Sequence, residues 1–290
     1  MKVIIDAEAG ACPGVRRAIR MVESSLSGKS RLLALGPVIH NERELERLAK
    51  IGLETIQQDS VSQSKALNGV KDRSLFVRTH GLSPHIRDKL LRAGADLIDG
   101  TCPRVRRVQE LIEQHYFRGL QILIVGKAEH PEVLGLLGHC EQMGVVLEKE
   151  SDRKRIDYSR PSILIAQTTV NPAKFQKWKQ MLSERIEHLI CVDTTCPQIN
   201  ARHEKLRAFA ASVDVLLMVG GSKSSNTGVL FEVCKAVNPR SYRIERPENI
   251  SDSWLAGAHL VGVTGSASTP FWQLEDVRTR LQEFALEGIK

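Results

Sequence analysis

The dipeptide Cys-Pro occurs three times in this 290-residue sequence, as Cys12-Pro13, Cys102-Pro103 and Cys196-Pro197. Random placement of six cysteines and eleven prolines would give about 6 × 11/290, or 0.2, such pairs. The spacings are 90 and 94 residues, so the chain contains an internal repeat. This repeat constrains the fold more than any local pattern does, because it predicts three related segments of roughly 95 residues.

The sequence around each Cys-Pro pair repeats as well. A short apolar run precedes each pair, and a basic stretch with helical spacing of its apolar residues follows it. A second apolar run in each segment leads into a polar loop, and a third run leads into another loop. The second-run loops contain His40, His130 and Ser224, each 28 residues after a Cys-Pro cysteine. The third-run loops are residues 79–81, 167–169 and 265–268.

Apolar strands that alternate with amphipathic helices are typical of βαβ units. We therefore predict an α/β fold with three pseudo-threefold-related lobes, each a small, mainly parallel sheet flanked by helices, around a central site. The predicted lobes are residues 1–95, 96–187 and 188–290. In such sheets the loops after the strands lie along one edge, where ligands bind. A single larger sheet with coincidental loops is the alternative.

Composition excludes several classes of protein. The chain is 42% apolar, which is enough for a sizeable core and excludes a disordered or disulfide-stapled chain. No apolar stretch approaches the roughly 18 residues of a membrane-spanning helix, and the first residues read as a strand rather than a secretion signal. Cysteines spread over such a chain favour thiols or metal ligands over disulfides. We expect a cytoplasmic protein that does not associate with a membrane.

The net charge is 41 − 34 = +7, and basic residues recur on the predicted helices after the cysteines. They form either a solvated helix face or a docking surface for an acidic electron carrier. Few aromatic residues (4%) and no recognisable nucleic-acid motif argue against DNA or RNA as a partner. The recurring residues are Arg16, Arg17 and Arg20, then Arg104, Arg106 and Arg107, then Arg202, Lys205 and Arg207.

A cysteine before the first proline of a helix lies where the helix dipole and free N–H groups stabilise a thiolate. Three such thiolates with no evident fourth ligand suit an iron–sulfur cluster with one open iron better than structural zinc. The alternative is that they are small packing residues, which is the role we expect for Cys140, Cys191 and Cys234.

The polar loops offer imidazoles, hydroxyls and an amide, which suit a diphosphate. Within these loops we take Glu132 as the proton donor. The other candidates are His40, His80, His130, Thr168, Ser224, Ser225, Asn226 and Ser268.

The motifs also have a characteristic order. They run Ala11-Cys12-Pro13-Gly14, Ile39-His40-Asn41, Thr79-His80-Gly81, Thr101-Cys102-Pro103, His130-Pro131-Glu132, Gln167-Thr168-Thr169, Cys196, Ser224-Ser225-Asn226 and Ala267-Ser268. In these residues, over nearly the whole chain, the sequence resembles the LytB/IspH family, the 4-hydroxy-3-methylbut-2-enyl diphosphate reductases of the non-mevalonate isoprenoid pathway. This resemblance implies a trilobed α/β fold and an oxidoreductase that forms isopentenyl and dimethylallyl diphosphate by reductive dehydroxylation.

The resemblance also implies a cofactor and roles for individual residues. One [4Fe-4S] cluster would be bound by Cys12, Cys102 and Cys196, and an electron donor such as ferredoxin or flavodoxin would reduce it. Glu132 would supply protons, helped by Thr168 and His130. The residues that would hold the diphosphate are His40, His80, His130, Thr168, Ser224, Ser225, Asn226 and Ser268.

Three positions depart from the usual family pattern. Ala11 stands where Phe is common, Gln109 where His is usual, and Ile199 where Thr is frequent. Alternatives to the reductase are a divergent paralogue that binds a different diphosphate, a redox sensor that keeps the cluster without turnover, and a zinc-dependent hydrolase.

Overall fold

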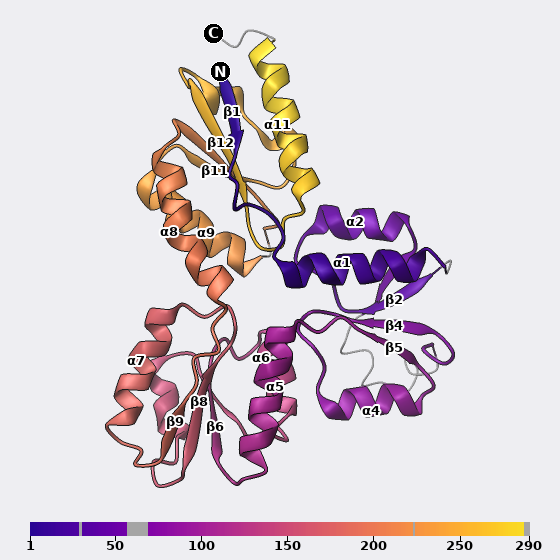
Figure 1. Ribbon diagram of the computed structural model, residues 1–290, viewed down its shortest axis with the longest axis vertical. Helices are drawn as coiled ribbons and strands as arrows, with labels where there is room; N and C mark the ends of the chain where they lie inside the picture. Colours follow the sequence, from indigo (N-terminus) through magenta and orange to yellow (C-terminus); the bar gives the residue numbers. More distant parts are fainter. Residues whose placement is uncertain (29–30, 57–68, 223, 287–290) are drawn as a thin grey trace. The chain divides into compact units, whose positions relative to one another are not determined.

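The structure is a computed structural model that describes residues 1–28, 31–56, 69–222 and 224–286 (Figure 1). It contains three four-stranded sheets in which all paired strands are parallel, flanked by helices, which confirms the predicted α/β class. The chain forms two compact units. Unit 1 comprises Met1–Glu23, Ile39–Gly52 and Ala201–Lys290, and unit 2 comprises Ser24–Val38 and Leu53–Asn200.

The sheet of unit 1 has the order β1-β12-β10-β11. Its strands are β1 (Lys2–Ile5), β12 (Leu260–Gly265), β10 (Val215–Val219) and β11 (Ser241–Ile244). Along β10, Leu217 packs in one core cluster with α11 (Phe271–Leu286), whereas Met218 packs in another with α8 (Pro197–Ala211) and α9 (Ser225–Val237). Both faces of the sheet are buried, which explains the continuous apolar run. The shorter helices are α2 (Glu42–Lys50), η3 (Pro247–Asn249) and α10 (Asp252–Leu255).

Unit 2 contains two sheets, with the orders β3-β2-β4-β5 and β7-β6-β8-β9. The strands are β2 (Leu32–Leu35), β3 (Leu53–Ile56), β4 (Ser74–Val77), β5 (Asp96–Asp99), β6 (Gln121–Val125), β7 (Val145–Leu147), β8 (Ser162–Ala166) and β9 (Leu189–Cys191). The helices are α4 (Pro84–Arg92), α5 (Pro103–Tyr116), α6 (Pro131–Gly138), η2 (Glu150–Arg155) and α7 (Pro172–Ser183). As in unit 1, alternate residues of β6 enter two different core clusters.

Each sheet is completed by the strand that directly precedes a Cys-Pro pair. β5 pairs with β4 before Cys102, and β9 pairs with β8 before Cys196. β1, which precedes Cys12, pairs with β12 from the far end of the sequence. The pairing thus groups β5 and β9 with the sheet of the preceding segment and β1 with the sheet of the last segment. The lobe boundaries 95/96 and 187/188 stay a prediction.

Proline begins the helix after each of the three cysteines: α1 (Pro13–Leu26), α5 and α8. The fixed φ of proline suits the first helical turn, and its missing N–H costs nothing there. Of the helices that the structure describes, none is long and apolar enough to cross a membrane.

Candidate active site

The three cysteines make equivalent backbone hydrogen bonds. The amide of Cys12 donates to the carbonyl of Ala267 at 3.0 Å, that of Cys102 to Thr79 at 3.0 Å, and that of Cys196 to Thr168 at 2.7 Å. All three acceptors lie in the polar loops that follow the third apolar run of each repeated segment. The internal repeat is therefore a repeat of hydrogen bonding, and it fixes each cysteine between a helix start and a polar loop.

An aspartate shapes the turn before each cysteine, which the sequence reasoning did not single out. Asp99 accepts from the amide of Thr101 at 2.9 Å, and Asp193 accepts from that of Thr195 at 3.0 Å. Asp6 accepts from the amide of Glu8 at 3.0 Å in the longer loop before Cys12. These are Asx turns. The signal in the sequence was an Asp three residues before Cys102 and before Cys196.

In unit 2, Glu132 lies in the first turn of α6 and is only 2% exposed. Its carboxylate accepts two hydrogen bonds from Thr168, one from the amide at 2.7 Å and one from the hydroxyl at 2.8 Å. Burial raises the pKa of Glu132 and outweighs these two hydrogen bonds, which lower it. A carboxyl group in such a place holds its proton to higher pH than an exposed one, as a general acid requires.

One histidine caps the helix turn that carries Glu132, and a second contacts the first. His130 is the N-cap of α6, and its Nδ1 accepts from the amide of Glu132 at 3.1 Å, so Nε2 carries the proton of a neutral ring. The rings of His80 and His130 meet edge to face with centroids 5.2 Å apart. Because Thr79, next to His80, holds the Cys102 amide, contacts within unit 2 link His80, His130, Glu132 and Thr168 to two of the cysteine loops.

In unit 1, the serine-rich loops of β10 and β12 meet. Ser224 caps α9 by accepting from the amide of Thr227 at 3.3 Å, and its Oγ lies 3.4 Å from Ser268 Oγ. Ser268 lies directly after the carbonyl that binds the Cys12 amide. The backbone of Gly221 packs closely against the carbonyl of His40. A Cβ at Gly221 would lie only 3.0 Å from that oxygen. Unit 1 therefore brings together Cys12, His40, Ser224 and Ser268.

The other two predicted phosphate ligands are less fully placed. Asn226 is half-buried in the first turn of α9. The side chain of Ser225 lies outside the part of the chain that is described.

The cysteines fall into two chemical groups. Cys12 and Cys102 are half-buried and Cys196 is buried, and each lies directly before the proline that begins a helix. Cys102 is an N-cap with no side-chain capping bond, so capping does not use its sulfur. By contrast, burial raises the pKa of Cys140 to about 11 and that of Cys234 to about 12, which keeps both as thiols.

No three His, Cys, Asp or Glu side chains form a metal-binding group among the residues described. Cys12 belongs to unit 1, whereas Cys102 and Cys196 belong to unit 2. The donor set itself, three cysteines before helix starts with equivalent amide bonds, fits thiolate ligation of a soft metal centre.

The structure corrects the prediction for Arg202, one of the basic residues that recur on the helices after the cysteines. It is 9% exposed, forms a buried ion pair with Asp6 and donates to the Thr264 hydroxyl at 2.7 Å. It therefore belongs neither to a solvated face nor to a docking surface. Sequence periodicity could not show this, because the partner Asp6 lies 196 residues away.

Two of the three family departures have clear structural settings. Gln109 is buried beside the Thr79–Gly81 loop, and its Nε2 has no hydrogen-bond partner among the residues described. A Cβ on Gly81, whose φ is +76°, would lie 2.3 Å from that nitrogen. Ala11 is buried and lines a pocket.

The repeated parallel α/β segments, each with a cysteine directly before a helix, define the class of this protein. It is an α/β protein with several sheets, in which cysteines precede the starts of helices. Comparison with known proteins identifies the member of that class. The model of the LytB protein family matches residues 3–282. The chain belongs to the LytB family, as the motifs predicted, and the enzymes of this family are iron–sulfur proteins.

Curated relatives match over the whole chain. The 4-hydroxy-3-methylbut-2-enyl diphosphate reductase of Chloroherpeton thalassium is 36% identical, over 99% of this chain and 98% of its own. The enzyme of the same name from Aquifex aeolicus is 34% identical, over 97% and 96%.

Solved structures agree with this assignment. One of (E)-4-hydroxy-3-methyl-but-2-enyl diphosphate reductase, the terminal enzyme of the non-mevalonate pathway, has a TM-score of 0.75 and 33% identity, over 97% of this chain and 99% of its own. The reductase from Plasmodium falciparum has a TM-score of 0.84 at 23% identity, over 97% of this chain and 87% of its own. At this identity the likeness supports the fold alone.

Proposed function

We propose that this protein reduces 4-hydroxy-3-methylbut-2-enyl diphosphate to isopentenyl and dimethylallyl diphosphate. In this reaction an allylic C–O bond breaks and a C–H bond forms, while two electrons and two protons enter and water leaves. Full-length relatives carry the name of this activity. The observation that carries the proposal is the buried Glu132 carboxyl, held by Thr168, whose own carbonyl holds the Cys196 amide.

One [4Fe-4S] cluster with Cys12, Cys102 and Cys196 as its ligands is part of this proposal. Their positions before helix starts and their matched amide hydrogen bonds support it. When bound, the cluster supplies electrons and a Lewis-acidic iron, which no side chain can provide.

Glu132 holds the proton that the reaction consumes. The amide and hydroxyl of Thr168 fix both carboxyl oxygens, so the group has one orientation. Burial keeps its pKa above that of an exposed glutamate, and the carboxyl therefore retains a proton more readily. His130 caps the same helix turn. In this proposal it helps Glu132 to supply protons.

The remaining predicted residues bind the diphosphate in this proposal. Hydroxyl groups at the start of α9 and in the loop after β12 offer donors to phosphate oxygens, and the helix N-terminus adds a favourable field. Histidines of the other loops add N–H donors. The set is His40, His80, His130, Thr168, Ser224, Ser225, Asn226 and Ser268.

An electron donor such as ferredoxin or flavodoxin is the partner, and a cytoplasmic location belongs to the same proposal. The test is an anaerobic assay with 4-hydroxy-3-methylbut-2-enyl diphosphate and reduced methyl viologen, with iron and sulfide counted in parallel. We expect turnover by the reconstituted protein. We also expect loss of the cluster in Cys12→Ser, Cys102→Ser and Cys196→Ser, but not in Cys191→Ser. A colourless reconstituted protein would contradict the cluster.

The Glu132→Gln variant tests the proton donor. Because general acid catalysis contributes roughly 10²–10⁴-fold, we expect turnover to fall by at least about 100-fold while cluster content and diphosphate binding persist. Glu129→Gln, a change at an exposed acid in the same loop, is the control and should keep its activity. A cluster-loaded wild type that binds the diphosphate without turnover would instead favour the redox sensor.

A further inference from the structure

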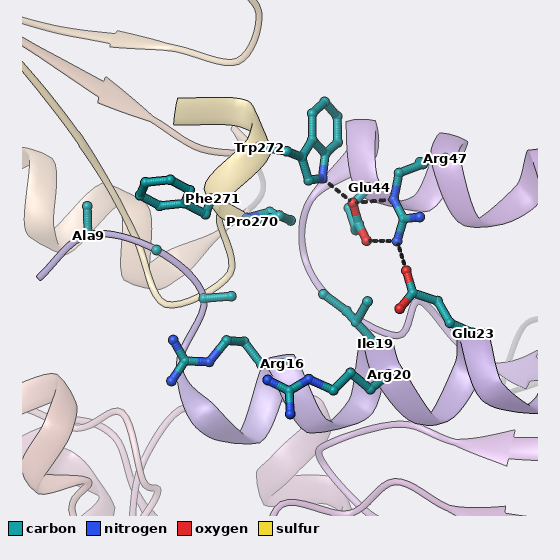
Figure 2. Close-up of a pocket in the computed structure, with 12 residues that line it drawn as sticks. Ala9, Arg16, Ile19, Arg20, Glu23, Glu44, Arg47, Pro270, Phe271 and Trp272 are labelled. Atoms are coloured by element: carbon teal, nitrogen blue, oxygen red, sulfur yellow. Dashed lines mark hydrogen bonds and ion pairs between the residues drawn. The ribbon is translucent and has the colours of Figure 1, made fainter. Parts of the chain in front are cut away.

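A pocket of about 440 Å³ lies within unit 1 beside the Cys12 loop (Figure 2). We call it the α1 pocket. One wall is apolar and contains Ala9, Ala11 and Pro270, with Phe271 at its rim, 56% exposed. Figure 2 shows the side chains of Arg16 and Arg20 along the opposite side. An apolar hollow with an exposed aromatic and two arginines has the composition of a protein-binding site.

The charges at the far end of the pocket are already compensated. Glu44, which is 1% exposed, accepts from Arg47 Nη2 at 2.6 Å and from Trp272 Nε1 at 2.8 Å. Arg47 also pairs with Glu23 at 2.6 Å. Figure 2 shows these groups as one hydrogen-bonded chain. This end of the pocket therefore has no need of an external ion.

The two arginines on the other side of the pocket have no such compensation. Arg16 and Arg20 are exposed, and neither forms an ion pair with any carboxylate of the described residues. They lie one turn apart on α1, where like charges repel and weaken a helix. That repulsion is relieved when a negatively charged surface binds.

On the other two helices that follow a Cys-Pro cysteine, several basic residues are already paired. On α5, Arg106 pairs with Asp99 at 2.8 Å. On α8, Lys205 pairs with Glu8 at 2.7 Å, and Arg202 is buried against Asp6. Exposed arginines without an ion pair among the described residues also occur on those helices, as Arg104 and Arg207 show, but Arg16 and Arg20 are the ones that line the α1 pocket.

The pocket also adjoins a proposed cluster ligand. Ala9, Gly10 and Ala11 form part of its wall, and Cys12 is the next residue. Ala11 has a small side chain where the family commonly has Phe, and this leaves the wall open. A partner seated here would contact the backbone that leads to the Cys12 sulfur.

We propose that Arg16, Arg20, Phe271 and the α1 pocket form the docking surface for an acidic one-electron carrier protein. This inference rests on the proposed function. Each docking event oxidises the carrier by one electron and reduces the cluster by one electron, and no atom is transferred. Two events supply the two electrons of one turnover. Carboxylates of the carrier would face the arginines, and an apolar side chain would enter the pocket.

The test uses the anaerobically reconstituted holoenzyme and a reduced ferredoxin of net negative charge. For Arg16→Glu/Arg20→Glu, we expect the KM for ferredoxin and the Kd from calorimetric titration to rise at least tenfold. Turnover with reduced methyl viologen should stay within twofold, which also shows that the variant is folded. Wild-type affinity should fall as salt is added, and that of the variant much less.

The matched control is Arg104→Glu/Arg207→Glu, which makes the same change of charge on α5 and α8 at two exposed arginines. We expect the KM of this control to change less than threefold, and Phe271→Ser to raise it about threefold or more. Equal losses in both double variants, or no loss in the α1 variant, would overturn the docking surface. Absence of turnover with methyl viologen in the wild type would instead refute the proposed function.

Discussion

Burial of the Glu132 carboxyl makes the stability of the protein depend on pH. Because its pKa is raised in the folded state, the folded protein holds a proton that the unfolded chain loses above about pH 4.3. The free energy of unfolding therefore falls as pH rises from there to the raised pKa, and stays low above it. We expect Glu132→Gln to remove this part of the decline in urea unfolding of the cluster-free protein. Glu129→Gln should leave it in place, and an unchanged profile in Glu132→Gln would contradict it.

The hydroxyl of Thr168 sets the acidity of the same group. It donates to Glu132 at 2.8 Å and lowers the pKa of that carboxyl. In Thr168→Val this donor is lost, so the pKa of Glu132 rises further, and the alkaline limb of the pH–rate profile should move to higher pH. We expect turnover to fall up to about tenfold, since the amide donor remains. Thr168→Ser keeps the hydroxyl and should keep the profile; a shift there equal to that in the valine variant would argue against this role.

Individual residues could be proposed for the site where the repeat pointed to them. His40, His130 and Ser224 were found because each follows its cysteine by the same interval. The orphan amide of Gln109 and the burial of Arg202 were not predictable, because both depend on contacts between segments distant in sequence.

Among the elements, β1, α8 and β12 are joined by one buried polar network. Arg202 on α8 pairs with Asp6 after β1, and both bond to Thr264 of β12. Removing one partner of a buried ion pair leaves an uncompensated charge, which costs about 3–5 kcal/mol. We expect Arg202→Met to lower the free energy of unfolding by that amount in urea titration.

Lys205→Met provides the control on the same helix. It breaks an ion pair with Glu8 whose partners are both more than half exposed, and such pairs contribute roughly 0–1 kcal/mol. Equal losses in the two variants would show that burial of the Asp6–Arg202 pair has no special weight.

Most elements could be predicted from local patterns. The apolar run 32–35 is β2 and the run 215–219 is β10, and each Cys-Pro proline begins a helix. The partner of β1 could not be predicted, because parallel pairing joins strands through long crossovers that leave no local pattern. The α1 pocket was also beyond local patterns, since its walls come from both ends of the sequence.

At the scale of the whole molecule, the proposed cluster would contribute to the stability of the folded chain. Metal binding to the folded state adds its free energy to stability, so iron removal should destabilise the assembly. We expect calorimetry of the cluster-free protein to show a lower melting temperature. The loaded protein should unfold in a single, higher transition. Identical traces with and without iron would contradict a cluster that binds the folded protein.

The pairing of β1 with β12 has a consequence for biosynthesis. During translation β1 leaves the ribosome more than 250 residues before β12, its hydrogen-bonding neighbour, has been made. Domains usually fold as they emerge, and both sheets of unit 2 can form from residues 32–191 in that interval. The sheet of unit 1 cannot be completed until β12 has been made, so a nascent chain that stalls before Leu260 exposes an unpaired apolar strand to chaperones and to aggregation.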